Sequence, residues 1–178
     1  APFQILVNNT GGPPGGPIVD ADIAAFLSAF NAHLINNHQL AQALVPGMEA
    51  LGYGRIINII STSVKAPLKG LGVSNTVRAA VGNWSKTLSM ELGPKQITVN
   101  NVLPGATLTQ RLSSIIANKA KQSGQAIQAV EQAMLNQIPM GRFAQAEEVA
   151  EAVCFLASPA AAYISGINIP VDGGRTPT

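Results

Sequence analysis

The stretch Gly54–Arg78 constrains the fold of this chain more than any other. It opens with Arg55–Ile60, a short isoleucine-rich apolar run that predicts a strand buried in a parallel sheet. Three hydroxyl residues, 61–63, follow this strand, and a loop of Gly, Pro and Lys residues leads to a helix that begins near Val73. In open α/β sheets, ligands bind outside the carboxyl ends of the strands. We therefore expect residues 61–63 to lie at a ligand-binding edge.

The helix that follows carries two more polar candidates. Ser74 and Arg78 are four residues apart, so they share one helical face and can converge on one ligand. An apolar stripe along this helix predicts which side faces the sheet. The stripe consists of Val77, Val81, Trp84 and Leu88. The opposite side predicts a subunit interface, because it carries small or polar residues, namely Ala79, Gly82, Asn83 and Lys86.

Strands and helices alternate along the rest of the chain. The other predicted strands are Gln4–Asn8, Gln96–Leu103 and Gly166–Asp172. A helical stretch is predicted from a cap at Asp20 or Asp22 to about Leu51, with a kink or break at Pro46. One or two helices are predicted in Leu108–Gln137, and another over Ala146–Ala157. This alternation predicts an α/β fold with a doubly wound parallel sheet, and residues 1–178 as a single domain without repeats or linkers.

Composition excludes several classes of protein. Charged residues make up 11% of the 178 residues, against about 25% in typical domains, which predicts that part of the exterior is buried in an oligomer. The net charge of +2 without a basic run argues against nucleic acid. No apolar span of about 18 residues and no signal peptide are present, which predicts a soluble, cytoplasmic protein that does not bind membranes.

The cysteine and the acidic residues predict neither a disulfide framework nor a metal. Cys154, the one cysteine, lies in an apolar stretch and is interpreted as an inert core residue. Glu147, Glu148 and Asp172 are not paired with a His or Cys at metal-ligand spacing, so no metal site is expected.

The spacing of Ser61, Ser74 and Arg78 resembles the active-site region of the short-chain dehydrogenase/reductase family, most closely its 3-oxoacyl-(acyl-carrier-protein) reductase branch. In that family a strand ends in a catalytic Ser, and Tyr-x-x-x-Lys follows thirteen residues later on a long helix. Ser61 stands at the position of the Ser. Ser74 and Arg78 stand where the Tyr and the Lys are expected, so the spacing is kept although the residue types differ.

Further motifs support the resemblance along nearly the whole chain. The sequence Asn-Asn-Thr-Gly at 8–11 is similar to the family's Asn-Asn-Ala-Gly, and residues 97–109 resemble its V-N-x-x-x-P-G-x-x-x-T. Segments 139–142 and 166–174 resemble its C-terminal signatures. The resemblance implies binding of NADP or NAD by Asn8, Asn9, Gly11, Arg78, Pro104, Gly105 and Thr109.

The first part of a Rossmann unit is expected to precede Ala1. A Gly-rich phosphate loop and an acidic ribose ligand belong there, and no G-x-G-x-x-G occurs in the sequence. The Gly-rich residues 11–16 have the wrong spacing and are interpreted as a stiff surface turn. We therefore expect only the C-terminal part of the fold, about four strands with flanking helices.

The resemblance implies an oxidoreductase that moves a hydride between a nicotinamide dinucleotide and a small carbonyl or alcohol, with a 3-oxoacyl thioester as a candidate substrate. It also implies a homodimer or homotetramer. The alternative is a catalytically inactive member that binds nucleotide or another subunit. Both hypotheses stay open, because the cofactor motifs are kept better than the catalytic ones.

The missing phenol leaves the proton donor undecided. The Ser74 hydroxyl is too weak an acid near neutral pH, and an N-cap role is an alternative for this residue. Two candidates remain: His33, where the family has a water-holding Asn, and Lys65, which could lose its proton if it were desolvated. Structural roles are the alternatives for Ser61 and His33, and solvent exposure is the alternative for Lys65 and Arg78.

Overall fold

A computed structural model describes residues 2–176, which form a four-stranded parallel sheet between helices. The strands are β1 (Ile5–Asn8), β2 (Gly54–Ile59), β3 (Ile97–Pro104) and β4 (Asn168–Val171), hydrogen-bonded in the order β1-β2-β3-β4. Each crossover between parallel strands must leave the sheet and return, which places helices on its faces. The predicted α/β fold with about four parallel strands is confirmed.

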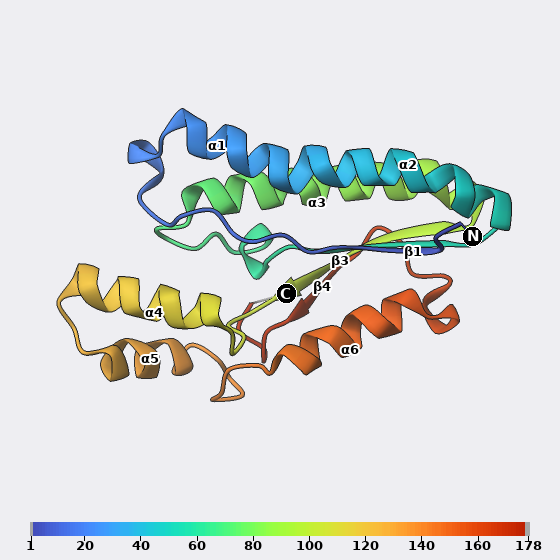
Figure 1. Ribbon diagram of the computed structural model, residues 1–178. Helices are drawn as coiled ribbons and strands as arrows, with labels where there is room; N and C mark the ends of the chain where they lie inside the picture. Colours follow the sequence, from blue (N-terminus) through green and yellow to red (C-terminus); the bar gives the residue numbers. More distant parts are fainter. Residues whose placement is uncertain (1, 177–178) are drawn as a thin grey trace.

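Helices cover both faces of the sheet (Figure 1). On one side lie α1 (Ile23–Phe30), α2 (Asn36–Leu51) and α3 (Gly72–Leu92). On the other side lie α6 (Ala146–Ala157) and the pair α4 (Gln110–Ser123) and α5 (Ile127–Leu135). Short 3₁₀ helices cover Ile18–Asp20, Thr62–Val64, Gly93–Lys95 and Pro159–Ala161.

The helical stretch after β1 begins as predicted and then differs from its prediction in two ways. Asp22 caps α1 as expected, since its side chain accepts from the backbone N–H of Ala24. A π-helical segment, Asn31–Ile35, separates α1 from α2, and such insertions are frequent at functional sites. Pro46 does not end the helix, which continues to Leu51. Proline removes one helical hydrogen bond, and burial of Ala41 and Met48 on the same helix offsets that loss.

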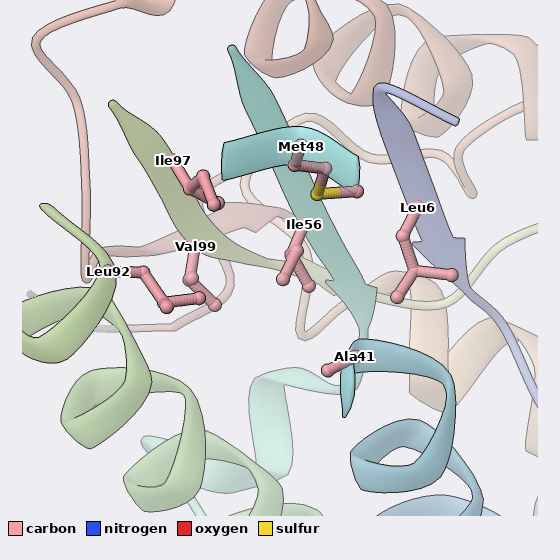
Figure 2. Close-up of a cluster of buried hydrophobic side chains, with 7 residues drawn as sticks. All are labelled: Leu6, Ala41, Met48, Ile56, Leu92, Ile97 and Val99. Atoms are coloured by element: carbon pink, nitrogen blue, oxygen red, sulfur yellow. The ribbon is translucent and has the colours of Figure 1, made fainter. Parts of the chain in front are cut away.

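The main core lies between the sheet and helices α2 and α3. Its members are shown as sticks in Figure 2: Leu6, Ala41, Met48, Ile56, Leu92, Ile97 and Val99. Val77 and Val81 of α3 are also buried, and Trp84 and Leu88 pack against the core, so the predicted apolar stripe is confirmed. A second cluster, containing Ile57, Val102 and Leu156, lies between the sheet and α6.

Three burial predictions are wrong. Ile5 and Val7 in β1 are each 45% exposed, because β1 pairs only with β2 among the described residues and α6 packs on β2, β3 and β4. Cys154 is exposed, since Leu156 takes the sheet-facing position of α6. Gly82 does not lie on the outer side of α3. It is buried, and a Cβ there would lie 3.3 Å from Val64 and 3.8 Å from Ile60.

A ladder of asparagine side chains crosses all four strands. The register pairs Asn8 with Asn58, Asn58 with Asn101, and Asn101 with Asn168. Along this row each amide bonds to the next, at 2.8, 3.0 and 2.8 Å. Ser85 Oγ of α3 accepts from Asn58 Nδ2 at 2.9 Å and lies 2.8 Å from Asn101 Oδ1. This buried polar row fixes the register beneath the carboxyl edge of the sheet, because a shift would leave its amides unpaired.

Candidate functional site

Ser61 lies directly after β2, at the carboxyl edge of the sheet. Its hydroxyl caps the 3₁₀ helix Thr62–Val64 by accepting from the backbone N–H of Ser63 at 3.1 Å. The Ser61 side chain is partly exposed. A serine hydroxyl that accepts one bond still has a proton to donate, so this structural role leaves Ser61 able to polarise a carbonyl oxygen.

Arg78 joins α3 to the end of β2. Its Nη1 donates to the carbonyls of Ile59 at 3.2 Å and Ile60 at 2.7 Å, and its Nε donates to Ser74 Oγ at 3.2 Å. Ser74 and Arg78 therefore share one face of α3, as predicted, and contact each other. The N-cap alternative for Ser74 is wrong, because Leu71 is the N-cap and Ser74 is buried inside the helix. Arg78 is partly buried, so the alternative of an exposed helix arginine is also wrong.

The electrostatic surroundings of Arg78 are positive. Burial lowers the pKa of its guanidinium to about 10, and the charge of Arg111 on α4 is the second cause. The side chain remains a cation at neutral pH. Within residues 2–176, its Nη2 group makes no hydrogen bond and no carboxylate pairs with it, so it can donate to a ligand.

His33 is buried within the π-helical segment and is 3% exposed. Its Nδ1 lies 2.6 Å from Thr10 Oγ1. Burial lowers the pKa of His33 below 6.5, the charge of Arg78 lowers this pKa further, and a backbone hydrogen bond at Gly11 opposes the change. Helix α3, which carries Ser74 and Arg78, packs against the π-helical segment that carries His33.

The other proton-donor candidate lies at the surface. Lys65 is exposed at the end of the 3₁₀ helix Thr62–Val64, so it lacks the desolvation on which its candidacy depended. The two tyrosines lie elsewhere as well. Tyr53 precedes β2 and donates to the Ala157 carbonyl, and Tyr163 precedes β4 and is fully exposed, which places both at the amino edge of the sheet.

The predicted cofactor residues lie along the carboxyl edge. Asn8 ends β1 with its Nδ2 bonded to Asn58, and its buried Oδ1 has no partner within the described chain. Asn9 and Gly11 are exposed on the loop beyond β1. At the end of β3, Pro104 and Gly105 lead to the loop before α4, and Thr109 caps α4 by accepting from the backbone N–H of Leu112 at 3.4 Å.

Gly105 also has a packing requirement. A Cβ there would lie 2.7 Å from the Cβ of Asp172 and 2.8 Å from its Cα, closer than real side chains approach. Its N–H donates to the Val171 carbonyl at 2.9 Å. The Pro-Gly step is therefore needed for the close approach of β3 and β4, whatever ligand it contacts.

Two open hollows flank the site. One, of about 730 Å³, is lined by Thr10 and by residues of α1, the π-helical segment and α2. The other, of about 720 Å³, lies between residues 17–19, the loop that follows Ser63 and the start of α3, and both Ser63 and Asn75 line it. The loops that wall it are joined where Gly16 N–H donates to the Gly70 carbonyl at 2.8 Å.

Sequence reasoning missed two residues of the cluster. Thr10 carries a detectable signal, because it stands where the resembled motif has Ala, and its added hydroxyl is the atom that contacts His33. Arg111 carries a weaker signal. A basic residue in the first turn of a helix opposes the helix dipole, and such a residue suggests a role other than stability.

The amino-acid sequence of this chain matches a known protein family. A family model described as "Enoyl-(Acyl carrier protein) reductase" matches residues 2–176, nearly the whole chain. The chain belongs to the short-chain dehydrogenase/reductase family. It is therefore a member of a family of oxidoreductases, and the expected family resemblance is confirmed.

Individual relatives of the family are similar over almost the whole chain. The 7alpha-hydroxysteroid dehydrogenase of Escherichia coli is 36% identical over 174 residues, which cover 96% of this chain and 63% of the relative. The 3-oxoacyl-[acyl-carrier-protein] reductase FabG of Pseudomonas aeruginosa is 36% identical over 172 residues, covering 96% and 64%. L-sorbose reductase from Gluconobacter frateurii, solved with NADPH and L-sorbose, is 33% identical with a TM-score of 0.90, covering 99% of this chain and 68% of that one.

The chain thus spans a little under two thirds of the length of these two curated relatives. Within residues 2–176, no group of three or more His, Cys, Asp or Glu residues could hold a metal ion. None of the helices in this part of the chain combines the length and the hydropathy that a membrane crossing requires.

Proposed function

We propose that this chain is part of an oxidoreductase that moves a hydride between NADP or NAD and the carbonyl or alcohol of a small molecule. The observation that carries the proposal is the Ser74–Arg78 pair, which is held against the end of β2 next to Ser61. His33 lies on the segment that packs against the same helix, in a chain of the short-chain dehydrogenase/reductase family. The sorbose reductase named above was solved with NADPH and a small sugar, which supports this class of cofactor and substrate.

The residues present fit a nicotinamide dinucleotide. Arg78 Nη2 is a cationic donor without a partner in residues 2–176, and Asn8 Oδ1 is a buried acceptor without one. Arg78 would bind a ribose or phosphate oxygen, and Asn8, Asn9, Gly11, Pro104, Gly105 and Thr109 would line the rest of the cofactor site. The bound nicotinamide would supply or accept the hydride, and the protein would position it and handle the proton.

Ser61 would orient and polarise the substrate carbonyl by donating a hydrogen bond to its oxygen. Reduction also requires that one proton reach this oxygen as the hydride reaches the carbon. His33 is the best-placed donor, because it is the group of this cluster whose ordinary pKa lies closest to neutrality. The protonated imidazole would lose one proton and become neutral, and the product alcohol would gain it.

Ser74 would act as a positioning residue rather than as the acid. Its hydroxyl accepts from Arg78 Nε and thereby holds the guanidinium against the end of β2. An aliphatic hydroxyl without a strong base beside it does not exchange protons efficiently near pH 7. Lys65, the second proton-donor candidate, has no proposed role, because it is exposed.

Oxidation of NADPH and of NADH tests the proposal, with the full-length protein that carries this sequence and a panel of carbonyl substrates. The panel should include sugars, steroid ketones and 3-oxoacyl thioesters. His33→Ala should lower kcat by about 10²–10⁴, the usual contribution of a general acid. Ser74→Ala should cost about tenfold or less, the value of one neutral hydrogen bond, and Ser61→Ala should cost more. Lys65→Ala serves as the matched control and should leave turnover within about twofold.

Two results would change the assignment. If Lys65→Ala abolishes turnover while His33→Ala does not, the proton donor is misplaced. If the wild-type protein binds the dinucleotide but turns over no substrate of the panel, the alternative of a nucleotide-binding member without activity replaces the proposal.

A further inference from the structure

Thr10 and His33 are two positions at which this chain departs from the motifs it resembles, and the structure joins them. Thr10 stands where the resembled motif has Ala, and His33 stands where the family has an Asn. Thr10 Oγ1 lies 2.6 Å from His33 Nδ1, although 23 residues separate the two in the chain. An Ala at position 10 could not make this hydrogen bond, so the two departures form one pair.

The imidazole of His33 lies on the buried side of its helical stretch. His33 is 3% exposed, and Ala29 and Asn37, four residues before and after it, are buried as well. Buried polar atoms need partners, because water cannot replace a missing hydrogen bond there. Among residues 2–176, the side chain that bonds to this ring is that of Thr10. Turning the ring by half a turn would put a carbon in place of Nδ1 and lose this bond, so Thr10 fixes the orientation of the ring.

The surroundings of Thr10 favour a proton on Nδ1 of the ring. Thr10 is partly exposed and lines the open hollow of about 730 Å³ beside α1 and α2, so its own hydroxyl proton can be donated to solvent. Its Oγ1 can then accept from Nδ1–H. Threonine is β-branched and stiff about its first side-chain torsion, which holds the accepting oxygen in one direction. The hydrogen bond of one ring nitrogen determines where the neutral ring carries its proton, so Nε2 is left free to gain and lose one.

We propose that Thr10 is a positioning residue for His33: its hydroxyl keeps one proton on Nδ1 and leaves Nε2 to exchange protons with the substrate. This inference rests on the proposed function for the reaction, whereas the place of the proton on the ring does not depend on it. In carbonyl reduction the Nε2–H bond of the imidazolium breaks, its proton goes to the carbonyl oxygen, and the hydride goes to the carbon. The ring remains in the neutral Nδ1–H form, still bonded to Thr10, and a proton from solvent restores Nε2–H.

Nuclear magnetic resonance of ¹⁵N-labelled histidine in the full-length protein tests the held tautomer without turnover. The signals of His33 are assigned by their loss in His33→Asn, and spectra are taken near about pH 8, where the ring is neutral. The wild type should carry its proton on Nδ1, and Thr10→Ser should retain that form. Thr10→Val, which keeps the shape and removes the hydroxyl, should give a mixture of the two neutral forms. Thr87→Val, at an exposed threonine whose hydroxyl bonds within α3, is the matched control and should keep the wild-type spectrum.

Turnover tests the consequence for the reaction. With a substrate from the panel above, Thr10→Val should lower kcat by about tenfold or more and leave KM within about twofold, because it misplaces the proton donor and removes no contact with the substrate. Thr10→Ser should keep most of the wild-type kcat. In the His33→Asn background, Thr10→Val should change kcat by less than about twofold, because no imidazole is left to position.

The inference is wrong if the neutral ring of wild-type His33 carries its proton on Nε2, or if Thr10→Val matches Thr87→Val in both tautomer and kcat. An equal loss of kcat from Thr10→Val with and without His33 would also refute it, since the hydroxyl would then act without the imidazole. If Thr10→Val fails to fold, Thr10→Ala makes the same comparison, and the wild-type tautomer alone still decides. A wild type with the proton on Nδ1 but without turnover would refute the proposed function and leave the assignment of this hydrogen bond standing.

Discussion

His33 illustrates how one residue links the structure to pH. In the folded protein, burial and Arg78 lower its pKa, so the native state binds fewer protons at this site than the unfolded chain does just below pH 6.5. Stability from this group is therefore fully present above about pH 6.5 and is lost as the pH falls from there through the lowered pKa of the folded state. The neutral imidazole, held by Thr10, is the form that the fold favours.

The first prediction concerns stability. The free energy of unfolding, measured by urea titration between pH 5 and 8, should fall on acidification, and His33→Asn should remove part of this decline because the titrating group is gone. His38→Asn, at the exposed histidine of α2, is the matched control and should keep the wild-type profile. An unchanged profile in His33→Asn would show that this residue contributes nothing to it.

The same shift has a consequence for catalysis under the proposed function. The acid form of His33 becomes populated only below its lowered pKa, so carbonyl reduction should speed up as the pH falls toward that value. Alcohol oxidation needs the neutral form and should be favoured above it. Arg78 remains cationic across this range, since its pKa of about 10 lies far above it.

At the scale of elements, the asparagine ladder joins the four strands and α3. Each of its amides is buried or partly buried, and most of their hydrogen bonds go to one another. Buried polar networks specify one arrangement strongly when they are satisfied and cost much when one member is removed. The ladder therefore sets the strand register that brings Ser61 and the ends of β1 and β3 to one edge.

The second prediction tests this ladder. Asn58→Ala removes its central member and leaves Asn8, Asn101 and Ser85 without their partner. Each buried group left unpaired costs about 1–3 kcal/mol, so the free energy of unfolding should fall by at least about 2 kcal/mol. Asn118→Ala, on the exposed face of α4, should change it by about 0.5 kcal/mol or less. Equal effects of the two substitutions in urea unfolding would contradict a structural role for the ladder.

The α4–α5 pair packs as a unit apart from the main core. Its buried residues form their own cluster, which includes Leu112, Ile116 and Val130. Such a unit, with few links to the sheet, can open locally at low cost in free energy. It follows the Pro104–Gly105 step and begins at its cap Thr109, so its movement would open or close the proposed cofactor site.

The third prediction is that residues 107–137 exchange their amide hydrogens faster than residues 56–60, which belong to β2 apart from the last one. The reason is that β2 lies in the centre of the sheet with core on both faces. Hydrogen exchange followed by mass spectrometry measures both segments in one experiment without ligand. Equal protection of the two segments would rule out a mobile lid.

At the scale of the whole molecule, exposed apolar residues lie on α1, which packs against α3. Ile23 and Leu27, one helical turn apart on α1, are 71% and 61% exposed. On α3 the predicted outer residues Ala79, Asn83 and Lys86 are exposed, whereas Gly82 faces inward. An exposed apolar stripe beside a face of small residues is typical of close helix packing between subunits.

The fourth prediction is that the full-length protein is a homodimer or homotetramer through these two helices. Sedimentation at micromolar concentration should give at least a dimer, and Ala79→Arg should shift it toward monomer because the new charge would be buried at the interface. Ala117→Arg, at an exposed position of α4, should leave the association unchanged. A wild-type monomer under these conditions would end the proposal.

The sequence alone determined the elements of this fold, because apolar runs and helical periodicity are local patterns. The run Arg55–Ile60 predicted β2, the stripe on α3 predicted its buried side, and the spacing of Ser74 and Arg78 predicted that they share one helical face. Whether β1, Cys154 and Gly82 are buried or exposed was not predictable in this way. It depends on which elements cover each face of the sheet and of the helices.

Only the tertiary structure decided which polar groups meet. The contact of Thr10 with His33 joins residues 23 positions apart, and that of Arg111 with Pro13 joins residues 98 apart. Strand register aligned four asparagines that lie far apart in the chain. Such contacts follow from how strands and helices pack in three dimensions, and a local pattern of residues carries no information about that packing.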